Sequence, residues 1–104
     1  MSSRRLKNGE IWKTKNSTIG KMMDENYHIQ IYVDENDYVH NEEGPAYESF
    51  YVKFWFIHGI LHREDGPAVV NKANKYEWRI DGEHLTERQF KNFICKKRIN
   101  KLKK

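Results

Sequence analysis

The chain has 104 residues and a formal net charge of +4, with 38% hydrophobic and 33% charged residues. This length suits a single domain, and an aromatic content of 13% favours a folded domain over a disordered one. The longest apolar-rich run is too short to span a bilayer, the N-terminal segment lacks the apolar region of a secretory signal, and the single cysteine, Cys95, cannot form an intrachain disulfide.

Residues 1–31 are predicted to form divergent N-terminal strands of the single domain 1–104. The sequence Asn8-Gly9-Glu10 resembles a later turn sequence, Asp81-Gly82-Glu83. Toward the end of this segment apolar residues alternate with more polar ones, which is the two-residue period of a half-buried strand. The apolar positions are Tyr27, Ile29, Ile31 and Val33.

Residues 32–85 contain a repeat. The stretch HNEEGPA at 40–46 returns as HREDGPA at 62–68, 22 residues later, and a Trp-x-x-x-Gly segment recurs with a spacing of 23. A period of this length is typical of a small unit that buries its apolar face only by stacking on its neighbours. The structural corner residues of the repeat are His40, Gly44, Pro45, His62, Arg63, Asp65, Gly66 and Pro67, and its core residues are Trp55, Gly59, Trp78 and Gly82.

The Gly-Pro corners are interpreted as turns rather than as active-site loops. Gly66 is expected to adopt a positive φ, and Pro67, which donates no ladder hydrogen bond, is expected to start a strand. The sequences His58-Gly59 and Asp81-Gly82 are expected to close β-hairpins, and Asp37 occupies the glycine position in a degenerate first copy. An active site needs one special loop, so the use of the same corner twice favours the structural interpretation.

The strand predicted over residues 50–57 is apolar on both faces. Its Phe54 and Phe56 fall on the face that carries charged residues in the next unit, so another element should cover them. We expect the cover to be a C-terminal helix over residues 86–102, because a threonine–glutamine capping box marks its start. The helix would dock through residues that share one face by their spacing. These residues are Phe90, Phe93 and Ile94.

The helix ends in a basic tail. Seven of the nineteen basic residues lie from Lys91 onward without an acidic residue, which leaves twelve basic and fifteen acidic residues, a net charge of −3, in residues 1–90. Such a tail attracts phosphate backbones, or it pairs with the acidic body of its own chain or stays solvated. It is too short and too poorly segregated to favour a membrane surface. The candidate contacts for nucleic acid or an acidic partner are Lys91, Lys96, Lys97, Arg98 and Lys101.

Residues 55–68 read W-x-x-x-G-x-x-H-R-x-D-G-P-A, a pattern that resembles a MORN-like repeat family found in proteins of tailed phages and large DNA viruses. Residues 80–90 also resemble the closing hairpin and helix of such proteins, and the likeness extends over residues 32–93. It is weaker in the first corner, where Asn41 and Glu43 replace Arg and Asp. The resemblance implies a meander of β-hairpins and a viral source, and it implies no catalytic activity.

The sequence shows no constellation that predicts catalysis or metal binding. The histidines are separated by whole repeats rather than by the short spacings of zinc ligands, and each is expected to bond a group of its own corner. The acidic pairs Glu42-Glu43 and Glu64-Asp65 lie in turns without a cleft to shift their pKa values. A small hydrolase would need His62 or His84 in a deep cleft with a carboxylate, and the nucleophile and nucleotide-binding motifs are missing from the sequence. We therefore expect no enzyme activity, no metal and no cofactor.

Together these patterns predict a mainly β (α+β) protein, an antiparallel β-hairpin repeat meander of about five to seven strands with a C-terminal α-helix. The predicted function is that of a non-enzymatic protein-interaction module of viral origin, located in the host cytoplasm or the virion, that binds a host or virion protein. The alternative is a small nucleic-acid-binding protein that uses the basic helix.

Overall fold

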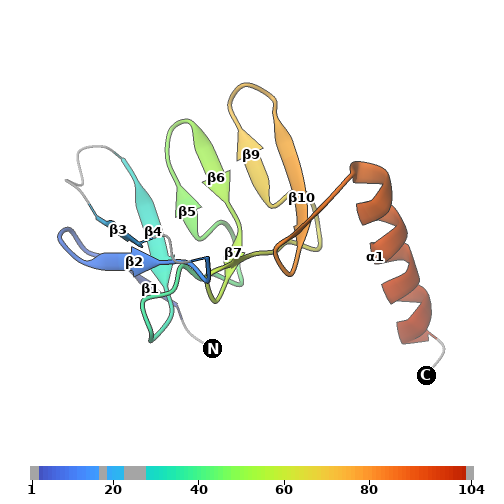
Figure 1. Cartoon of the computed structure of the whole chain (residues 1–104), viewed down its shortest axis with the longest axis horizontal. Helices are drawn as coiled ribbons and strands as arrows, with labels where there is room; N and C mark the ends of the chain where they lie inside the picture. Colours follow the sequence, from blue (N-terminus) through green and yellow to red (C-terminus); the bar gives the residue numbers. More distant parts are fainter. Residues whose placement is uncertain (1–2, 17–18, 23–27, 103–104) are drawn as a thin grey trace.

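The computed structural model describes residues 3–16, 19–22 and 28–102, and it shows an antiparallel sheet with a helix at one end (Figure 1). The predicted fold class is confirmed. Within these residues the main sheet has seven strands in the order β1-β4-β5-β6-β9-β10-β11, so that successive hairpins lie side by side along it. The strands are β1 (Arg4–Arg5), β4 (Gln30–Val33), β5 (Tyr47–Glu48), β6 (Val52–Phe54), β9 (Val69–Asn71), β10 (Tyr76–Ile80) and β11 (Glu83–Leu85).

Two short hairpins accompany the main sheet. β2 (Ile11–Lys13) pairs with β3 (Ile19–Lys21), and β7 (Phe56–Ile57) pairs with β8 (Ile60–Leu61). The predicted single strand that contains Trp55 is thus divided into β6 and β7. The division arises because β6 pairs with β9 in the main sheet, whereas β7 turns away and pairs with β8.

The two Gly-Pro corners have matching backbone hydrogen bonds. The Ala46 N–H donates to the Phe54 carbonyl (2.9 Å), and the Ala68 N–H donates to the Glu77 carbonyl (2.8 Å). The two donors are 22 residues apart and the two acceptors 23 residues apart, the same spacings as in the sequence. The repeat in the sequence is therefore also a repeat of backbone structure.

The hairpin turns His58-Gly59 and Asp81-Gly82 have positive φ at both central residues, 46° and 81° in the first turn and 51° and 83° in the second. These values are close to those of type I′ turns, which match the twist of the flanking strands. Each turn is held by the preceding unit, because its glycine N–H donates to the carbonyl of Val39 (2.7 Å) or Leu61 (2.8 Å). Asp37 has a φ of 66°, so the degenerate first copy keeps a left-handed residue although glycine is replaced.

The main core lies between the N-terminal hairpin β2–β3 and the first half of the sheet (Figure 1). The predicted alternation is confirmed at Ile31 and Val33, which are both buried, whereas Tyr27 lies outside the described residues. Gly20 permits the packing of the hairpin, because a Cβ there would lie only 2.3 Å from the Trp12 ring. The buried cluster consists of Leu6, Met22, Ile31, Val33, Val39 and Ala46, with Trp12, Ile29, Tyr47 and Phe56 packed against it.

The helix α1 (Glu87–Leu102) begins at the predicted capping box. The Thr86 N–H donates to Oε1 of Gln89 (2.9 Å), and the Gln89 N–H donates to Oγ1 of Thr86 (3.1 Å). This reciprocal arrangement satisfies two backbone donors that the helix leaves without an internal partner. The sequence prediction of the helix start is confirmed.

The predicted docking of α1 on Phe54 and Phe56 is wrong. The helix contacts β10 and β11 at the far end of the sheet, where Phe90 is buried and Phe93 is 39% exposed (Figure 1). Only Thr86 separates β11 from the helix, and so short a connection keeps the helix beside the last two strands. Phe56 packs instead against the core beneath the N-terminal hairpin.

Candidate functional site

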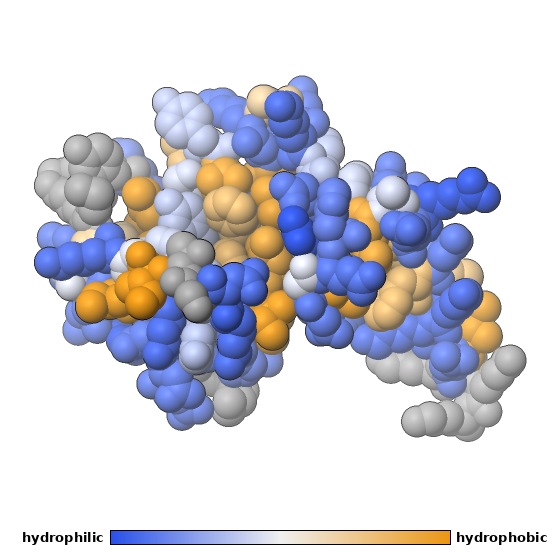
Figure 2. Space-filling model, in the orientation of Figure 1, coloured by the Kyte–Doolittle hydropathy of each residue, from blue (hydrophilic) through white to orange (hydrophobic). Residues whose placement is uncertain are grey.

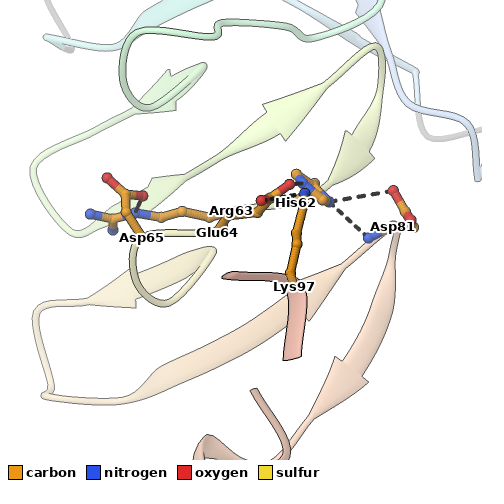
Figure 3. A network of polar contacts seen from close by, with 6 residues as sticks. All are labelled: His62, Arg63, Glu64, Asp65, Asp81 and Lys97. Carbon is orange, nitrogen blue, oxygen red and sulfur yellow. Dashed lines mark hydrogen bonds and ion pairs between the residues drawn. The ribbon is translucent and has the colours of Figure 1, made fainter. Parts of the chain in front are cut away.

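The corner at residues 62–68 carries a network of polar contacts (Figure 3). Nδ1 of His62 accepts a hydrogen bond from the Asp81 N–H (3.0 Å), and Nε2 lies 3.0 Å from Oε2 of Glu64. The other carboxylate oxygen of Glu64 accepts from Nζ of Lys97 on α1 (2.6 Å). The network therefore joins a corner, the turn of the next unit and the helix.

The carboxylates of this corner are held in the ionised form. The hydrogen bond from Lys97 lowers the pKa of Glu64 below its ordinary value, and the contact with His62 adds to this effect. The Arg63 guanidinium, whose Nε donates to Asp65 at 2.7 Å, lowers the pKa of Asp65 in the same way. These groups act as paired anions near neutral pH, and general acid catalysis would require a raised pKa instead.

The corner at residues 40–46 uses its histidine in the same way but in a buried environment. Nδ1 of His40 accepts from the His58 N–H (2.9 Å), and the two rings stack with centroids 3.9 Å apart. His58 in turn donates from Nδ1 to Oδ2 of Asp34 (2.7 Å). Nε2 of His40 is buried and has no hydrogen-bond partner among the described residues.

Burial acts on both His40 and Asp34, but it decides the charge state of His40 alone. Burial and the neighbouring His58 ring lower the pKa of His40 below its ordinary value, so the imidazole is neutral near neutral pH. Burial opposes ionisation of Asp34, but the hydrogen bonds from His58 and from two backbone N–H groups outweigh it and lower the pKa of the carboxyl. A neutral His40 is the form that accepts a hydrogen bond at Nδ1.

The expectation that each histidine bonds a group of its own corner is only partly correct. His62 contacts Glu64 within its corner, but Nδ1 of His62 and Nδ1 of His40 both accept from the turn of the following unit. The physical reason is that these turns, at His58 and Asp81, have N–H groups directed at the preceding corner. In both corners the histidine side chain therefore links one repeat unit to the next.

The predicted positive φ of Gly66 is also wrong, because positive φ occurs at Gly9, Gly59 and Gly82 among the described glycines. Gly66 instead makes room for Arg63, since a Cβ there would lie 2.9 Å from Cζ of the guanidinium. The guanidinium lies over the Trp55 ring at 3.9 Å and donates to the Pro67 carbonyl at 3.0 Å. The second corner needs glycine for a close side-chain approach.

An aromatic groove lies beside the N-terminal hairpin, beyond the half of the sheet over which that hairpin packs. It has a volume of about 570 Å³ and is lined mainly by Trp12, Tyr47, Phe54, Phe56, Ile60 and Leu61. Edge-to-face contacts join Trp12 to Tyr47 at 6.0 Å and Tyr47 to Phe54 at 5.5 Å. Figure 2 shows hydrophobic residues gathered at the centre of this face, between the N-terminal hairpin and the polar residues toward β10.

The rim of the groove is polar. Lys15 lies on the side of the N-terminal hairpin, and Arg79 and Asp81 lie on the opposite side. Arg79 is fixed in place, because Nη2 lies 2.9 Å from Oε1 of Glu77 and Nη1 donates to the Gly82 carbonyl at 3.0 Å. The groove thus combines an apolar floor with a charged rim.

The sequence did not identify this groove, although one signal for it was present. The apolar character of Phe54 and Phe56 indicated a covered face, but the cover was assigned to the helix. Trp12 and Leu61 join the groove only through the tertiary fold. The stacked His40 and His58 were likewise unpredicted, because they are brought together by unit stacking rather than by sequence spacing.

The basic residues of the helix lie partly in ion pairs with the chain itself. Lys97 pairs with Glu64, and Lys91 pairs with Glu87 one helical turn away at 3.3 Å. Arg98 lies beside the acidic corner, in a shallow pocket that Asp65 also lines. The remaining candidates are Lys96, which is exposed, and Lys101, whose side chain lies outside the described part of the structure.

The two histidines proposed for a hydrolase differ in exposure, because the side chain of His62 is only 19% exposed and lines a pocket together with Glu64 and Asp65. His62 belongs to the corner network, and His84 is exposed on β11. Within the described residues, three or more metal-ligating side chains are nowhere gathered into one group. In the same part of the chain, no helix is long and apolar enough to cross a membrane.

Comparisons with protein-family models, with curated proteins and with solved structures found no match to this chain. The resemblance to MORN-like repeats, and the viral source that it implies, therefore stay predictions from the sequence.

Proposed function

We propose that the protein is a non-enzymatic interaction module that binds a partner protein through the aromatic groove. The observation that carries this proposal is the incomplete cover of one sheet face. The N-terminal hairpin packs over the first half of the sheet, whereas Phe54, Ile60 and Leu61 line an open groove beyond it.

The size of the groove suits apolar side chains of a partner. Its volume of about 570 Å³ lies in the range of binding pockets and accommodates one or two large side chains. Burial of each such side chain contributes about 2 kcal/mol before ordering costs. A single occupied groove therefore supports a modest affinity, and the charged rim at Lys15 and Arg79 adds selectivity.

The rigidity of the groove supports the same function. Its floor is built from strands and two hydrogen-bonded hairpin turns, and the rings of Tyr47, Phe54 and Phe56 contact one another in series. A preformed surface loses little conformational freedom when a partner binds. The proposal includes the prediction from the sequence that the partner is a host or virion protein.

The proposal is tested with peptides selected against the immobilised protein from a random library. Selected peptides should carry an aromatic or large aliphatic anchor, and the Thr14→Trp variant, which fills the groove from its wall, should weaken their binding by about tenfold or more. A matched control is Phe93→Ala, an exposed position on α1 that should leave the Kd unchanged. Equal affinity for Thr14→Trp and the unaltered protein would rule out the groove as the docking site.

A further inference from the structure

The ends of two hairpins form a surface that the groove does not include. We call it the tip surface and define it as residues 49–53, the turn from β5 into β6, and residues 70–76, the turn from β9 into β10 with the adjoining strand residues (upper part of Figure 1). It contains three lysines and no acidic residue. Its aromatic side chains are unusually exposed, with Phe50 at 67%, Tyr51 at 69% and Tyr76 at 47%.

The two tips are fixed to each other by hydrogen bonds. The Lys72 N–H donates to the Tyr51 carbonyl (2.8 Å), and Nζ of Lys72 lies 3.3 Å from the centroid of the Phe50 ring. Within the first tip, the Ser49 hydroxyl accepts from the Tyr51 N–H (3.3 Å). The rings and the ammonium group are therefore held on one surface before any partner arrives.

The aromatic and cationic side chains continue down one face of the sheet. Lys53 and Tyr76 flank Val70 as cross-strand neighbours, and neighbours in register share a face. The Tyr76 ring lies 6.3 Å from the Trp78 ring farther along β10. Lys53 is 3.6 Å from Glu48, whereas Lys72 and Lys75 have no carboxylate within ion-pair distance among the described residues.

The opposite ends of the hairpins have the opposite charge. The two Gly-Pro corners carry Glu42 and Glu43 in the first and Glu64 and Asp65 in the second. The hairpin tips are thus cationic and aromatic, whereas the corners at the opposite ends carry Glu42 and Glu43 together with the ion-paired Glu64 and Asp65. An anionic partner is attracted more strongly to the tips than to the corners.

We propose that the tip surface binds single-stranded nucleic acid. Unpaired bases stack on exposed aromatic rings, and phosphates are attracted to lysines, without a requirement for a particular base sequence. Tyr51 and Tyr76 offer the rings, and Lys72 and Lys75 offer the charges. An acidic peptide has the charge but lacks the stacking bases that rows of exposed rings select.

A lipid surface fits the geometry less well. Membrane-inserting tips project apolar side chains beyond their cationic groups, whereas Lys72 folds over the Phe50 ring here. The aromatic row also extends from Tyr76 to Trp78 along the strand, away from the tip. An extended polymer contacts such a row along its length.

The test measures binding of a fluorescent oligothymidylate of about ten nucleotides by anisotropy at low and at physiological salt. Tyr51→Ala should weaken binding by about tenfold, and Tyr51→Phe should retain most of the affinity because the ring is kept. The double variant Lys72→Ala, Lys75→Ala should lower the affinity and reduce the slope of log K against log salt by about 1.4, two single-strand phosphates.

Controls separate the tip surface from the other candidates. These variants change exposed side chains, so their urea unfolding midpoints should match that of the unaltered protein. The double variant Lys96→Ala, Arg98→Ala on α1 should bind the oligonucleotide normally, and inorganic polyphosphate should compete weakly because it has no bases.

The proposal is overturned if the oligonucleotide does not bind, or if only the α1 variant weakens its binding. It is also overturned if polyphosphate competes as well as the oligonucleotide while Tyr51→Ala binds fully. Binding to anionic phosphatidylserine vesicles in place of the oligonucleotide would overturn it too.

Discussion

The corners at residues 40–46 and 62–68 have the same backbone hydrogen bonds but different surroundings. In both corners a histidine Nδ1 accepts from the next turn, at 2.9 Å in the first and 3.0 Å in the second. His40 is fully buried and its Nε2 has no hydrogen-bond partner among the described residues, whereas the side chain of His62 is 19% exposed and its Nε2 contacts Glu64.

The corners also differ in the contacts that their variable residues make. The second corner has Arg63, which lies over Trp55 and bonds Asp65, whereas the first has the shorter Asn41 at the same position. Asn41 donates to the Pro45 carbonyl at 3.2 Å and so replaces only one of the bonds that Arg63 makes. The repeated residues thus set the path of the backbone, and the variable residue that follows the histidine changes how many contacts hold the corner.

The largest expected difference in stability is between the two variants that remove a corner histidine. His40→Ala should lower the free energy of unfolding by about 2–4 kcal/mol, because it leaves a cavity and an unpaired N–H at His58. His62→Ala should cost about 1 kcal/mol, since the N–H that it leaves belongs to Asp81, an exposed residue. Urea unfolding followed by tryptophan fluorescence measures both values. A larger loss for His62→Ala would contradict the role assigned to burial.

The second prediction concerns acid destabilisation. The folded pKa of His40 is below that of the unfolded chain, about 6.5, so the unfolded state binds more protons in the interval between them. The free energy of unfolding should therefore fall as the pH drops below about 6.5, by at most about 1.4 kcal/mol per pH unit, and level off below the folded pKa. Urea midpoints at a series of pH values give this slope.

A matched variant isolates the contribution of His40 to this pH dependence. The charged or titratable groups near it are His58, Asp34 and Glu42. The carboxyls of Asp34 and Glu64 have lowered pKa values, so their stabilisation is present above about 4 and is lost only as the pH falls below that. His40→Asn should flatten the slope between pH 6.5 and about 5. A slope that persists in His40→Asn would assign it to another group.

The third prediction compares the corner glycines. Gly66→Ala should cost about 1 kcal/mol, because its Cβ would displace the Arg63 guanidinium from Trp55. Gly44→Ala should be nearly neutral, since the nearest atom, Nδ2 of Asn41, is 4.0 Å from the added Cβ. In an Arg63→Ala background the cost of Gly66→Ala should vanish. A cost that remained would point to the backbone rather than to the guanidinium.

The smallest expected effect is at the link between helix and sheet. Lys97→Ala should lower stability by about 0.5 kcal/mol, because both partners of the ion pair with Glu64 are partly exposed. The effect should shrink at high salt. Lys96→Ala, on an exposed neighbouring position, is the control and should change the thermal midpoint by less than the Lys97 variant. Equal effects would show that the pair adds nothing.

Several local features were predictable because they depend on short stretches of chain. The positive φ values at Gly59 and Gly82 follow from glycine between strand-like runs, and the helix start follows from Thr86 and Gln89. The repeat of the corner backbone follows from the repeated His, Gly, Pro and Ala. Each of these is determined within about ten residues, where steric limits and local hydrogen bonds dominate.

The predictions that were wrong concern features that depend on contacts between distant residues. The helix was expected over Phe54 and Phe56, but its short connection from β11 places it at the end of the sheet. Gly66 was expected to adopt a positive φ, yet it accommodates Arg63. In both cases the sequence indicated that a residue has a specific structural role, but it did not indicate which distant residue that residue contacts.

The sequence alone determined that the chain forms stacked antiparallel hairpins with a capped C-terminal helix, because turn chemistry and hydrophobic periodicity are local properties. Only the tertiary structure decided which apolar residues are covered and which line the groove, and which histidine is buried. The reason is that burial depends on where the N-terminal hairpin and the helix come to lie, and those positions result from packing between segments far apart in the chain.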